Sequence, residues 1–400
     1  MKDTAAASIE IPFFSLLEGR RETNKLERAK IERVATGKGI VDLSMLNPDI
    51  APPRLLQDRL VEAALNPTSN RYSVSRGIRK LREAFCFKYH SKWGVTLNPE
   101  SQVCVTMGAK DATLNILRLL AEDSKKRILL PSPCYPAHRV AAELANLELF
   151  YFNLSSDQES MLEEIKSSVQ KNSIDILFLN FPNNPTGLAV SPDFMREIVD
   201  FSNANRCFLL HDFVYGEMNF NRELEPSILQ FNKEPYYGMA EIYSMSKAYS
   251  IPGWRVAVAA GDAQVIGNLS KLKSKVDYGN FLPIQLAASH ALFCQHDLIE
   301  EVVKQYASRS KLLVNGLEDL GWMVQASTAT PMLWCNLPEH CKLNALEFCA
   351  TLIRDFGVSV APGCDYGEVF DNYIRIALVA SEENLQHLIE SISSISGQWS

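Results

Sequence analysis

Lys247 is the residue whose surroundings best suit covalent chemistry. It follows an apolar run, residues 241–246, that predicts a strand, and this run contains Ser244 and Ser246. Arg255 follows after a proline–glycine break. A lysine amine condenses with an aldehyde to give a Schiff base, while hydroxyls and a guanidinium can bind a phosphate. The stretch therefore predicts a site for an aldehyde that carries a phosphate, pyridoxal 5'-phosphate (PLP).

Taken alone, a lysine between serines is more often an ordinary surface residue beside a turn. The upstream sequence favours the chemical interpretation, because further residues of suitable type also follow predicted strands. These residues are Gly108, Tyr135, Asn184 and Asp212. The carboxyl ends of parallel strands meet at one edge of a sheet, where ligands bind. We therefore expect these side chains and Lys247 to share one site.

Three of these positions have a physical reason to bind a charged ligand. Gly108 precedes a predicted helix, whose free N–H groups and dipole suit a phosphate. Asp212 ends the apolar run 207–212, where a carboxylate is costly unless it meets a positive charge. Arg375 stands inside a predicted strand, between two isoleucines, and a buried arginine needs an anion.

Composition excludes several other classes of function. The chain has 400 residues, of which 46% are hydrophobic and 22% charged, with a net charge of −7 and no basic stripe, so nucleic acid and membrane surfaces are poor partners. No apolar run reaches the roughly 18 residues of a membrane span, and the start does not resemble a signal peptide. The nine cysteines are scattered without metal-ligand spacing. We expect no metal, and a reducing, cytoplasmic location.

Hydrophobic patterning predicts an α/β fold with a second unit. From residue 101 onward strands alternate with helices, which indicates a largely parallel sheet. The predicted strands are 102–106, 127–130, 147–152, 174–179, 207–212, 241–246 and 254–260. We expect an N-terminal arm with part of the small domain at 1–45, a large domain at 46–290 and a small α+β domain at 291–400.

Ordered motifs along residues 41–395 give the chain a family resemblance. They are Tyr72 with Gly77, Gly108-Ala-Lys110, Pro133-Cys-Tyr135-Pro, Asn183-Asn-Pro-Thr-Gly187, Asp212 with Tyr215, Ser244-Met-Ser-Lys247, Gly253-Trp-Arg255, Asp277-Tyr-Gly-Asn-Phe281, Pro362-Gly363 and Arg375. The pattern resembles the class I/II, fold-type I PLP-dependent aminotransferases, especially the branch of alanine, LL-diaminopimelate and bacilysin-pathway aminotransferases. The resemblance implies a mainly parallel seven-stranded sheet with helices on both faces, plus a smaller α+β domain.

The resemblance also implies a role for each matched residue. The implied catalytic residues are Lys247, which forms the aldimine and moves protons, Asp212, which pairs with the pyridinium nitrogen, and Tyr215. The implied PLP-binding residues are Gly108, Ala109, Lys110, Tyr135, Asn184, Asp212, Tyr215, Ser244, Ser246, Lys247 and Arg255, together with Tyr72, which would reach the phosphate of a second subunit. The implied substrate-binding residues are Arg375, Asn184 and Leu46.

The implied activity moves an α-amino group between an L-amino acid and a 2-oxo acid by a ping-pong route, in a homodimer with shared sites. One alternative is a PLP enzyme of the same fold that performs elimination, oxidation or cyclisation. Another is a non-catalytic protein that keeps the fold. The first alternative stays open because the pocket departs from the family: Leu46 stands where relatives have glycine and should crowd the substrate carboxylate, and Pro331-Met332 replaces an aromatic pair.

Overall fold

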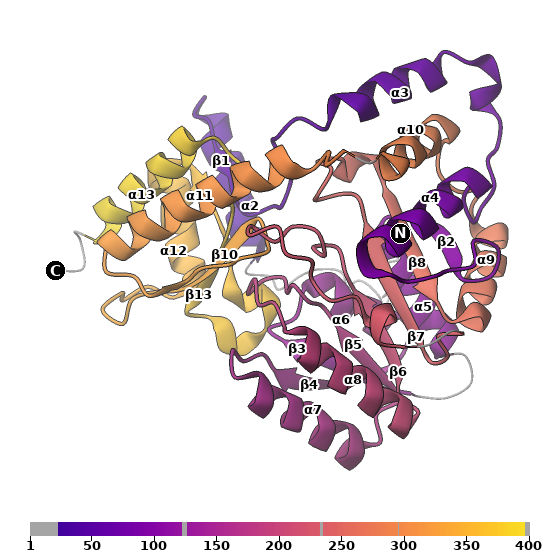
Figure 1. Cartoon of the computed structure of the whole chain (residues 1–400). Helices are drawn as coiled ribbons and strands as arrows, with labels where there is room; N and C mark the ends of the chain where they lie inside the picture. The colour runs from indigo at the N-terminus through magenta and orange to yellow at the C-terminus, as the bar shows by residue number, and fades with distance from the viewer. Residues whose placement is uncertain (1–22, 122–125, 233–234, 295, 397–400) are drawn as a thin grey trace, which may run out of the picture.

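A seven-stranded sheet at the centre of the larger of two units positions most of the predicted residues (Figure 1). The computed structural model describes residues 23–121, 126–232, 235–294 and 296–396. The strand order is β2-β8-β7-β6-β5-β3-β4. The strands are β2 (Val103–Met107), β3 (Arg127–Ser132), β4 (Glu148–Asn153), β5 (Ile176–Leu179), β6 (Phe208–Asp212), β7 (Met239–Ser244) and β8 (Val256–Gly261).

The sheet is mainly parallel, as the sequence predicted. Strands β3 to β7 run parallel to their neighbours among themselves, and β8 is antiparallel to both β2 and β7. Strand β8 is reversed because the chain turns back directly after Lys247 without a crossover helix. The carboxyl ends of β5, β6 and β7 therefore lie at one edge, each followed by a segment that carries candidate site residues.

Helices cover both faces of this sheet, which confirms the predicted layering. Buried residues of α5, α6 and α9 form one cluster on one face, while those of α4, α7, α8 and α10 belong to a cluster on the other face. The helices are α4 (Arg79–Trp93), α5 (Ala109–Leu120), α6 (Pro136–Leu144), α7 (Gln158–Asn172), α8 (Pro192–Asn205), α9 (Ala263–Val276) and α10 (Leu282–Phe293).

The central strands are apolar on both faces because each face is covered. In β5, Ile176 and Phe178 belong to the first cluster, whereas Leu177 and Leu179 belong to the second. This alternation follows from the two-residue period of a strand. It also explains why β5 reads as a continuous apolar run rather than as alternating apolar and polar residues.

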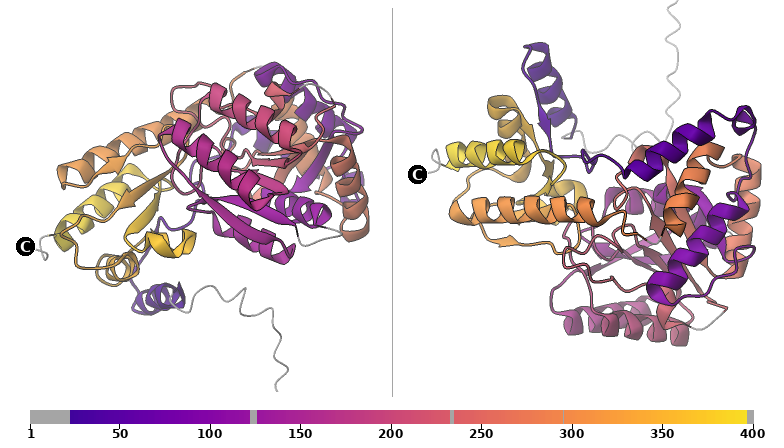
Figure 2. Two further views of the ribbon diagram at one scale, coloured as in Figure 1. Left: turned by 90° about the horizontal axis from the view of Figure 1, so that it is seen from below. Right: turned by 45° about the horizontal axis from the view of Figure 1, so that its top comes forward.

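The C-terminal unit contains a four-stranded sheet in the order β12-β13-β10-β9, flanked by helices. Its elements are β9 (Val324–Gln325), β10 (Met332–Asn336), β11 (Val358–Ser359), β12 (Ala361–Pro362), β13 (Tyr373–Ala377), α11 (Glu300–Asp319), α12 (Ala345–Thr351) and α13 (Glu382–Ser396). The N-terminal segment joins this unit, since β1 (Val41–Asp42) pairs in parallel with β11. Helix α2 (Thr23–Ala35) stands out from the body in Figure 2.

Helix α3 and the end of the large domain differ from the sequence-based expectation. Helix α3 (Arg54–Ala64) was not predicted, because the prolines before it read as a rigid turn although proline is tolerated at the start of a helix. Residues 1–22 of the expected N-terminal arm lie outside the described residues, which show α2 from residue 23. Helix α10 also crosses the expected boundary at residue 290 and ends at Phe293. We propose that the large domain extends to residue 293.

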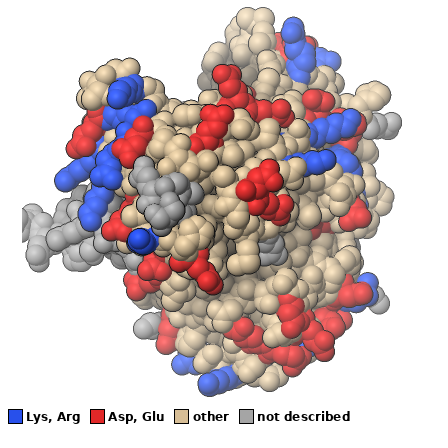
Figure 3. Space-filling model, turned by 90° about the vertical axis from the view of Figure 1, so that its left-hand side faces the viewer, with Lys and Arg blue, Asp and Glu red and all other residues tan. Residues whose placement is uncertain are grey.

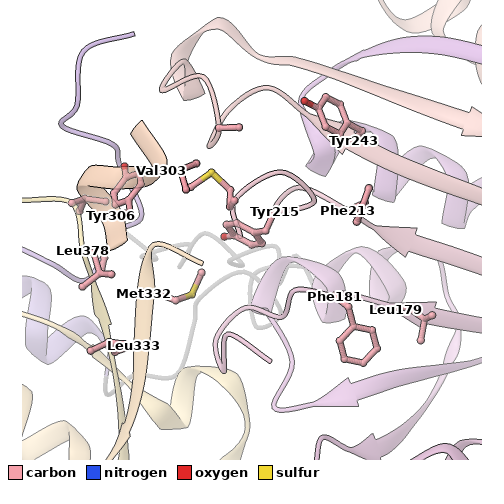
Figure 4. Packing of buried hydrophobic residues seen from close by; sticks show 14 of the residues in the cluster. Leu179, Phe181, Phe213, Tyr215, Tyr243, Val303, Tyr306, Met332, Leu333 and Leu378 are labelled. Carbon is pink, nitrogen blue, oxygen red and sulfur yellow. The ribbon is translucent and has the colours of Figure 1, made fainter. Parts of the chain in front are cut away.

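One apolar cluster continues from the large sheet into the C-terminal unit. Tyr215 and Phe213 follow β6, and they belong to the same buried cluster as Met332 of β10 and Tyr306 of α11 (Figure 4). Arg309 of α11 adds a polar link, because its guanidinium contacts both carboxylate oxygens of Asp49 at 2.6 and 2.8 Å. The two units are thus packed together rather than joined by a bare linker.

The surface carries charges of both signs. Figure 3 shows lysine and arginine interspersed with aspartate and glutamate on the face that carries the C-terminal unit. Within the described ranges, no helix has the length and apolarity needed to cross a membrane. The same ranges contain no group of three His, Cys, Asp or Glu side chains placed to hold a metal ion.

Glu241 is the buried hub of a polar network within the large unit. Its carboxylate lies in β7 and accepts hydrogen bonds from Tyr89 Oη (2.9 Å), Ser227 Oγ (2.7 Å) and the Ile228 N–H (2.9 Å), and it contacts His211 Nδ1 at 2.9 Å. Glu241 and His211 have no exposed surface. His211 therefore lies in the core, as the alternation along its strand predicts.

Replacing Glu241 by leucine should destabilise the protein strongly, because four buried polar groups lose their partner at once. We expect Glu241→Leu to lower the free energy of unfolding by about 3 kcal/mol or more, measured by urea unfolding of the apoprotein. Glu62→Ala, which removes an exposed ion pair with Arg59, should change it by less than about 0.5 kcal/mol. Equal effects of the two substitutions would contradict this account of the network.

Candidate active site

A cavity of about 560 Å³ lies between the carboxyl ends of the central strands and the C-terminal unit. It is lined by residues from both units and from the N-terminal segment. Most of the residues predicted from the sequence line it: Leu46, Ala109, Lys110, Tyr135, Asn184, Asp212, Tyr215, Ser244, Ser246, Lys247, Arg255 and Arg375. The fold thus brings together side chains that are up to about three hundred positions apart in the chain.

Lys247 presents its amine to the cavity three residues after β7 ends at Ser244. Its Nζ donates a hydrogen bond to the backbone oxygen of Leu46 at 2.5 Å. Burial, together with the positive charges of Arg375, Arg255 and Lys110, lowers the pKa of Lys247 from its usual 10.5 to about 8. An amine with this pKa is available as a nucleophile and as a base near neutral pH.

Asp212 is held at the end of β6 by two polar contacts. Its Oδ2 lies 2.7 Å from Nε2 of His138, and its backbone oxygen accepts a hydrogen bond from Asn180 Nδ2 at 3.0 Å. The other carboxylate oxygen, Oδ1, is buried and has no hydrogen-bond partner among the described residues. A buried carboxylate oxygen without a partner is costly, so this atom is suited to receive a ligand's N–H group.

The phosphate-binding candidates gather at one end of the cavity. Ser244 Oγ and Ser246 Oγ lie 3.0 Å apart. No side chain caps the N-terminus of α5, so the N–H groups of its first turn face the cavity beside Arg255. Gly108 has φ +88°, and a Cβ atom at this position would lie 2.0 Å from Nη2 of Arg255. The lack of a side chain at Gly108 lets the guanidinium approach this helix end.

Arg375 enters the cavity from β13 of the C-terminal unit. It is buried, its Nη1 donates to Oδ1 of Asn184 at 3.2 Å, and its Nη2 donates to the backbone oxygen of Ser44. The guanidinium also lies 5.4 Å from the ring centre of Tyr366. Its Nε has no hydrogen-bond partner among the described residues. A buried guanidinium that meets only neutral groups is a natural receptor for a carboxylate.

Two tyrosines complete the wall near Lys247 and Asp212. Tyr215 is almost fully buried, and burial raises the pKa of its hydroxyl well above 10.0, so that it remains a hydrogen-bond donor at neutral pH. Tyr135 begins α6, and the amine of Lys110 lies 5.5 Å from its ring centre. Tyr135 and Tyr215 thus offer a flat face and a hydroxyl donor to the same cavity.

Two predicted residues do not line the cavity. Gly108 lies just behind the lining and shapes the approach of Arg255, as described above. Tyr72 is 84% exposed, and its ring packs against Tyr278 at a centroid distance of 4.4 Å. In this single chain Tyr72 therefore stands on the outer surface, where only a second molecule could bring it to a site.

Three residues of the site were not predicted from the sequence. His138 contacts Asp212 from the first turn of α6, Asn180 supports the backbone of Asp212, and Tyr366 packs against Arg375. His138 carried one usable signal, because it follows Tyr135 by three residues and should share its helix face. Asn180 and Tyr366 depend on contacts between distant segments, which a single sequence does not show.

The chemistry of these groups fits PLP. The α5 N-terminus with Ser244, Ser246 and Arg255 would hold the phosphate, and the amine of Lys247 would meet the aldehyde. Asp212 Oδ1, which has no partner among the described residues, would accept a hydrogen bond from the protonated ring nitrogen. Asn184 and Tyr215 would donate to the phenolic oxygen, and Tyr135 would pack on the ring.

Comparisons with known proteins agree with this fit. The family model described as aminotransferase class I and II matches residues 38–392. LL-diaminopimelate aminotransferase of Moorella thermoacetica is 32% identical over 94% of this chain and 95% of its own length. Glutamate-pyruvate aminotransferase AlaC of Escherichia coli is 30% identical over 90% of this chain and 87% of its own. The apo-BacF structure from Bacillus subtilis is 29% identical, with a TM-score of 0.86 over 95% of this chain and 96% of its own.

The pKa of about 8 for Lys247 can be measured by competitive acetylation of the apoprotein. Lys247 should become reactive with a midpoint near pH 8, whereas an ordinary lysine amine titrates near pH ~10.4. The exposed Lys171 serves as the internal reference. Arg375→Ala should move the Lys247 midpoint upward, because it removes a positive charge that disfavours the ammonium form. A midpoint for Lys247 equal to that of Lys171 would contradict the assigned environment.

Proposed function

The chain belongs to the aminotransferase class I and II family and is a PLP-dependent aminotransferase, and we propose which of its residues carry out the transfer. The observation that supports the proposal is the shared cavity of Lys247, Asp212 and Arg375, which follow β7, end β6 and lie within β13, respectively. The amine can react with the PLP aldehyde and move a proton, the carboxylate can pair with the ring nitrogen of PLP, and the guanidinium can bind the substrate carboxylate. The names of the relatives do not favour elimination, oxidation, cyclisation or a non-catalytic role.

Each residue has one task in this proposal. Arg375 holds the substrate α-carboxylate in a two-pronged pair, with Asn184 beside it. Bound PLP supplies an electron-withdrawing ring that stabilises negative charge at the substrate Cα. Lys247 Nζ accepts the Cα proton in its neutral form and later returns a proton, which a pKa near 8 permits at neutral pH. Tyr215 keeps its hydroxyl proton at neutral pH and would donate a hydrogen bond to the bound cofactor.

His138 and Asn180 position Asp212 in this scheme. His138 contacts the carboxylate of Asp212 and Asn180 donates to its backbone oxygen, so the first restrains the side chain and the second the main chain. Such contacts from the surrounding shell hold a catalytic group in its working orientation. His138 thereby explains why only one of the two Asp212 oxygens remains without a partner among the described residues.

The enzyme acts on an amino acid and a 2-oxo acid, and we propose that both are recognised first through the α-carboxylate. Relatives named for glutamate and pyruvate and for LL-diaminopimelate match this chain to a similar degree, which supports an L-amino acid substrate of this general class. Leu46 lines the cavity, and its backbone oxygen accepts a hydrogen bond from the Lys247 amine; we propose that its side chain narrows the cavity there. Leu46→Gly should therefore lower KM for bulkier amino acids, and an unchanged KM would remove Leu46 from this role.

We further propose that the enzyme is a homodimer that shares its sites and works in the cytoplasm. Exposed apolar side chains support the dimer, among them Val61, Leu65, Tyr72, Val276 and Tyr278. None of the nine cysteines, all of which are described, forms a disulfide, which supports a reducing compartment, and cell fractionation would test this location.

Arg375→Ala should weaken the reaction with amino acids and spare amines that lack a carboxylate. In single-turnover mixing of the PLP-loaded enzyme with an L-amino acid, the spectrum should change to the pyridoxamine form, and a 2-oxo acid should reverse it. We expect Arg375→Ala to lower kcat/KM by about 100-fold or more, because two charge-assisted hydrogen bonds are lost. The kcat/KM of Arg375→Lys should fall between those of Arg375→Ala and the unchanged enzyme, since lysine keeps the positive charge but cannot form the two-pronged pair.

An alkylamine of matching side-chain length is the control for this experiment. Its slow reaction should be similar in Arg375→Ala and in the unchanged enzyme. A loss as large with the alkylamine as with the amino acid would show that Arg375 does not act through the carboxylate. No spectral response to any amino acid, in enzyme that binds PLP, would contradict the proposed roles of Lys247 and Arg375 together.

Mixed dimers test the placement of Tyr72. Tyr72→Phe and Lys247→Ala subunits should each bind PLP poorly, but a dimer of one of each contains one site with both groups intact. After unfolding and refolding of an equal mixture, about one quarter of sites should recover tight PLP binding, as random pairing in a twofold dimer requires. Sedimentation should show a dimer throughout. A monomer, or no recovery on mixing, would contradict shared sites.

A further inference from the structure

The connection between α9 and α10, with the helix ends beside it, contacts both α5 and Arg255 of the proposed phosphate site. It contains the Asp277-Tyr-Gly-Asn-Phe281 motif, whose residues have no part in the proposed reaction. We define the 273–285 segment as this connection together with Lys273 at the end of α9 and Gln285 in the first turn of α10. Its contacts reach three places: the N-terminus of α5, the backbone at Arg255, and the loop that carries Tyr72.

Lys273 connects the segment to α5. Its side chain is fully buried, and its Nζ lies 3.1 Å from Oδ2 of Asp111 and 2.8 Å from Oδ2 of Asp277. Asp111 is the third residue of α5, and the same Oδ2 accepts a hydrogen bond from the Met107 N–H at 2.9 Å. A buried ammonium between two carboxylates tolerates little displacement, because each lost contact would leave a buried charge unpaired. The first turn of α5 is thus tied to residue 277.

Asn280 connects the segment to Arg255. Its Nδ2 donates to the backbone oxygen of Arg255 at 2.6 Å, and Asn280 is itself buried. Arg255 has φ +56°, a left-handed conformation that a residue with a long side chain seldom adopts. Such a backbone needs outside support, and it directs the guanidinium over Gly108. Asn280 supplies that support at the carbonyl of the strained residue.

Gln285 and Tyr278 connect the segment to the loop around Tyr72. Gln285 Nε2 donates to Ser73 Oγ at 2.8 Å and to the Asn280 backbone oxygen at 2.6 Å, and its Oε1 accepts from the Ile78 N–H at 2.8 Å. The rings of Tyr278 and Tyr72 lie 4.4 Å apart. One side chain, Gln285, therefore joins the Asn280 backbone to the Tyr72 loop.

We propose that the 273–285 segment sets the spacing of the phosphate-binding groups, with Lys273 and Asn280 as positioning residues. Lys273 places the α5 N-terminus through Asp111, and Asn280 places Arg255 through its backbone. Neither side chain lines the cavity. The inference rests on the proposed phosphate site and adds to it the residues that hold its two halves at a fixed distance. It predicts that cofactor binding depends on Asn280 only when the cofactor carries a phosphate.

Asn280→Ala should reduce the affinity of the apoprotein for PLP by about tenfold, the effect of one lost hydrogen bond that orients a charged ligand group. For pyridoxal, which has the aldehyde but no phosphate, the dissociation constant of Asn280→Ala should lie within about twofold of that of the unchanged protein. Equilibrium titration followed by absorbance gives both dissociation constants. Asn280→Asp, which keeps the shape but cannot donate to the Arg255 carbonyl, is the second variant and should show the same selective loss.

Asp262→Ala is the matched control, because it destabilises the N-terminal end of α9, the helix that leads into the 273–285 segment. Asp262 caps α9 by accepting hydrogen bonds from the Gln264 and Val265 N–H groups at 2.8 and 3.1 Å. It should lower thermal stability while both dissociation constants stay the same. Asn280 variants that lose PLP and pyridoxal affinity equally, or that bind PLP as the unchanged protein does, would overturn the inference.

A double-mutant cycle identifies the route through Arg255. Arg255→Ala should itself lower PLP affinity selectively, and adding Asn280→Ala should cause almost no further loss. Additive losses would overturn the inference and leave the proposed phosphate site standing. Equal loss of PLP and pyridoxal in Arg255→Ala would overturn the phosphate site and the inference with it. Lys273→Met should lower PLP affinity further in the Arg255→Ala background, because it acts on α5.

Discussion

The cavity concentrates positive charge that the chain holds in place with neutral groups. Lys247, Arg255 and Arg375 all face it, and burial, followed by the repulsion from the two arginines, lowers the pKa of the lysine. Each donates to backbone oxygens: Lys247 to Leu46, Arg375 to Ser44, and Arg255 to Pro252 and Met107. A carbonyl oxygen satisfies a donor without neutralising its charge. The positive charge of the three side chains therefore favours the binding of anions, and a phosphate at one end of the cavity and a carboxylate at the other would neutralise it.

The need to bind two anions a fixed distance apart explains why the site spans two units of structure. Lys247 follows β7 and Arg255 directly precedes β8 of the large sheet. Arg375 lies in β13 of the smaller sheet, and Ser44, which accepts its hydrogen bond, follows β1. Placing the cations on separate rigid elements fixes the distance between the two anion sites and prevents the cations from relaxing apart. The apolar cluster that continues between the units, and the Asp49–Arg309 pair, hold these elements together (Figure 4). The burial of apolar surface between the units thus offsets the electrostatic repulsion among Lys247, Arg255 and Arg375.

The sequence was sufficient for the sheet because the sheet depends on local patterns. Continuous apolar runs predicted the buried strands, and the polar residue after each run marked the edge where the cavity lies. Contacts made across the fold were not predictable in this way. His138 of α6 meets Asp212 at the end of β6 although 74 positions separate them, and Lys273 meets Asp111 because α9 packs beside α5. Helix α3 was missed for a local reason, since its first turn follows prolines that resemble those of a loop.

The division of labour in the cavity accounts for a family that shares one reaction and differs in substrate. The groups proposed for PLP and proton transfer stand at strand ends in the seven-stranded sheet, where a change would disturb a packed core. The facing wall comes from residues 26–47 and 359–366, which meet through the two-residue pairing of β1 with β11. Within this wall, residues 44–47 are at least partly exposed, so their side chains can change at little expense to the core. Substrate choice can therefore change in this wall, Leu46 included, while the sheet continues to perform the same transfer.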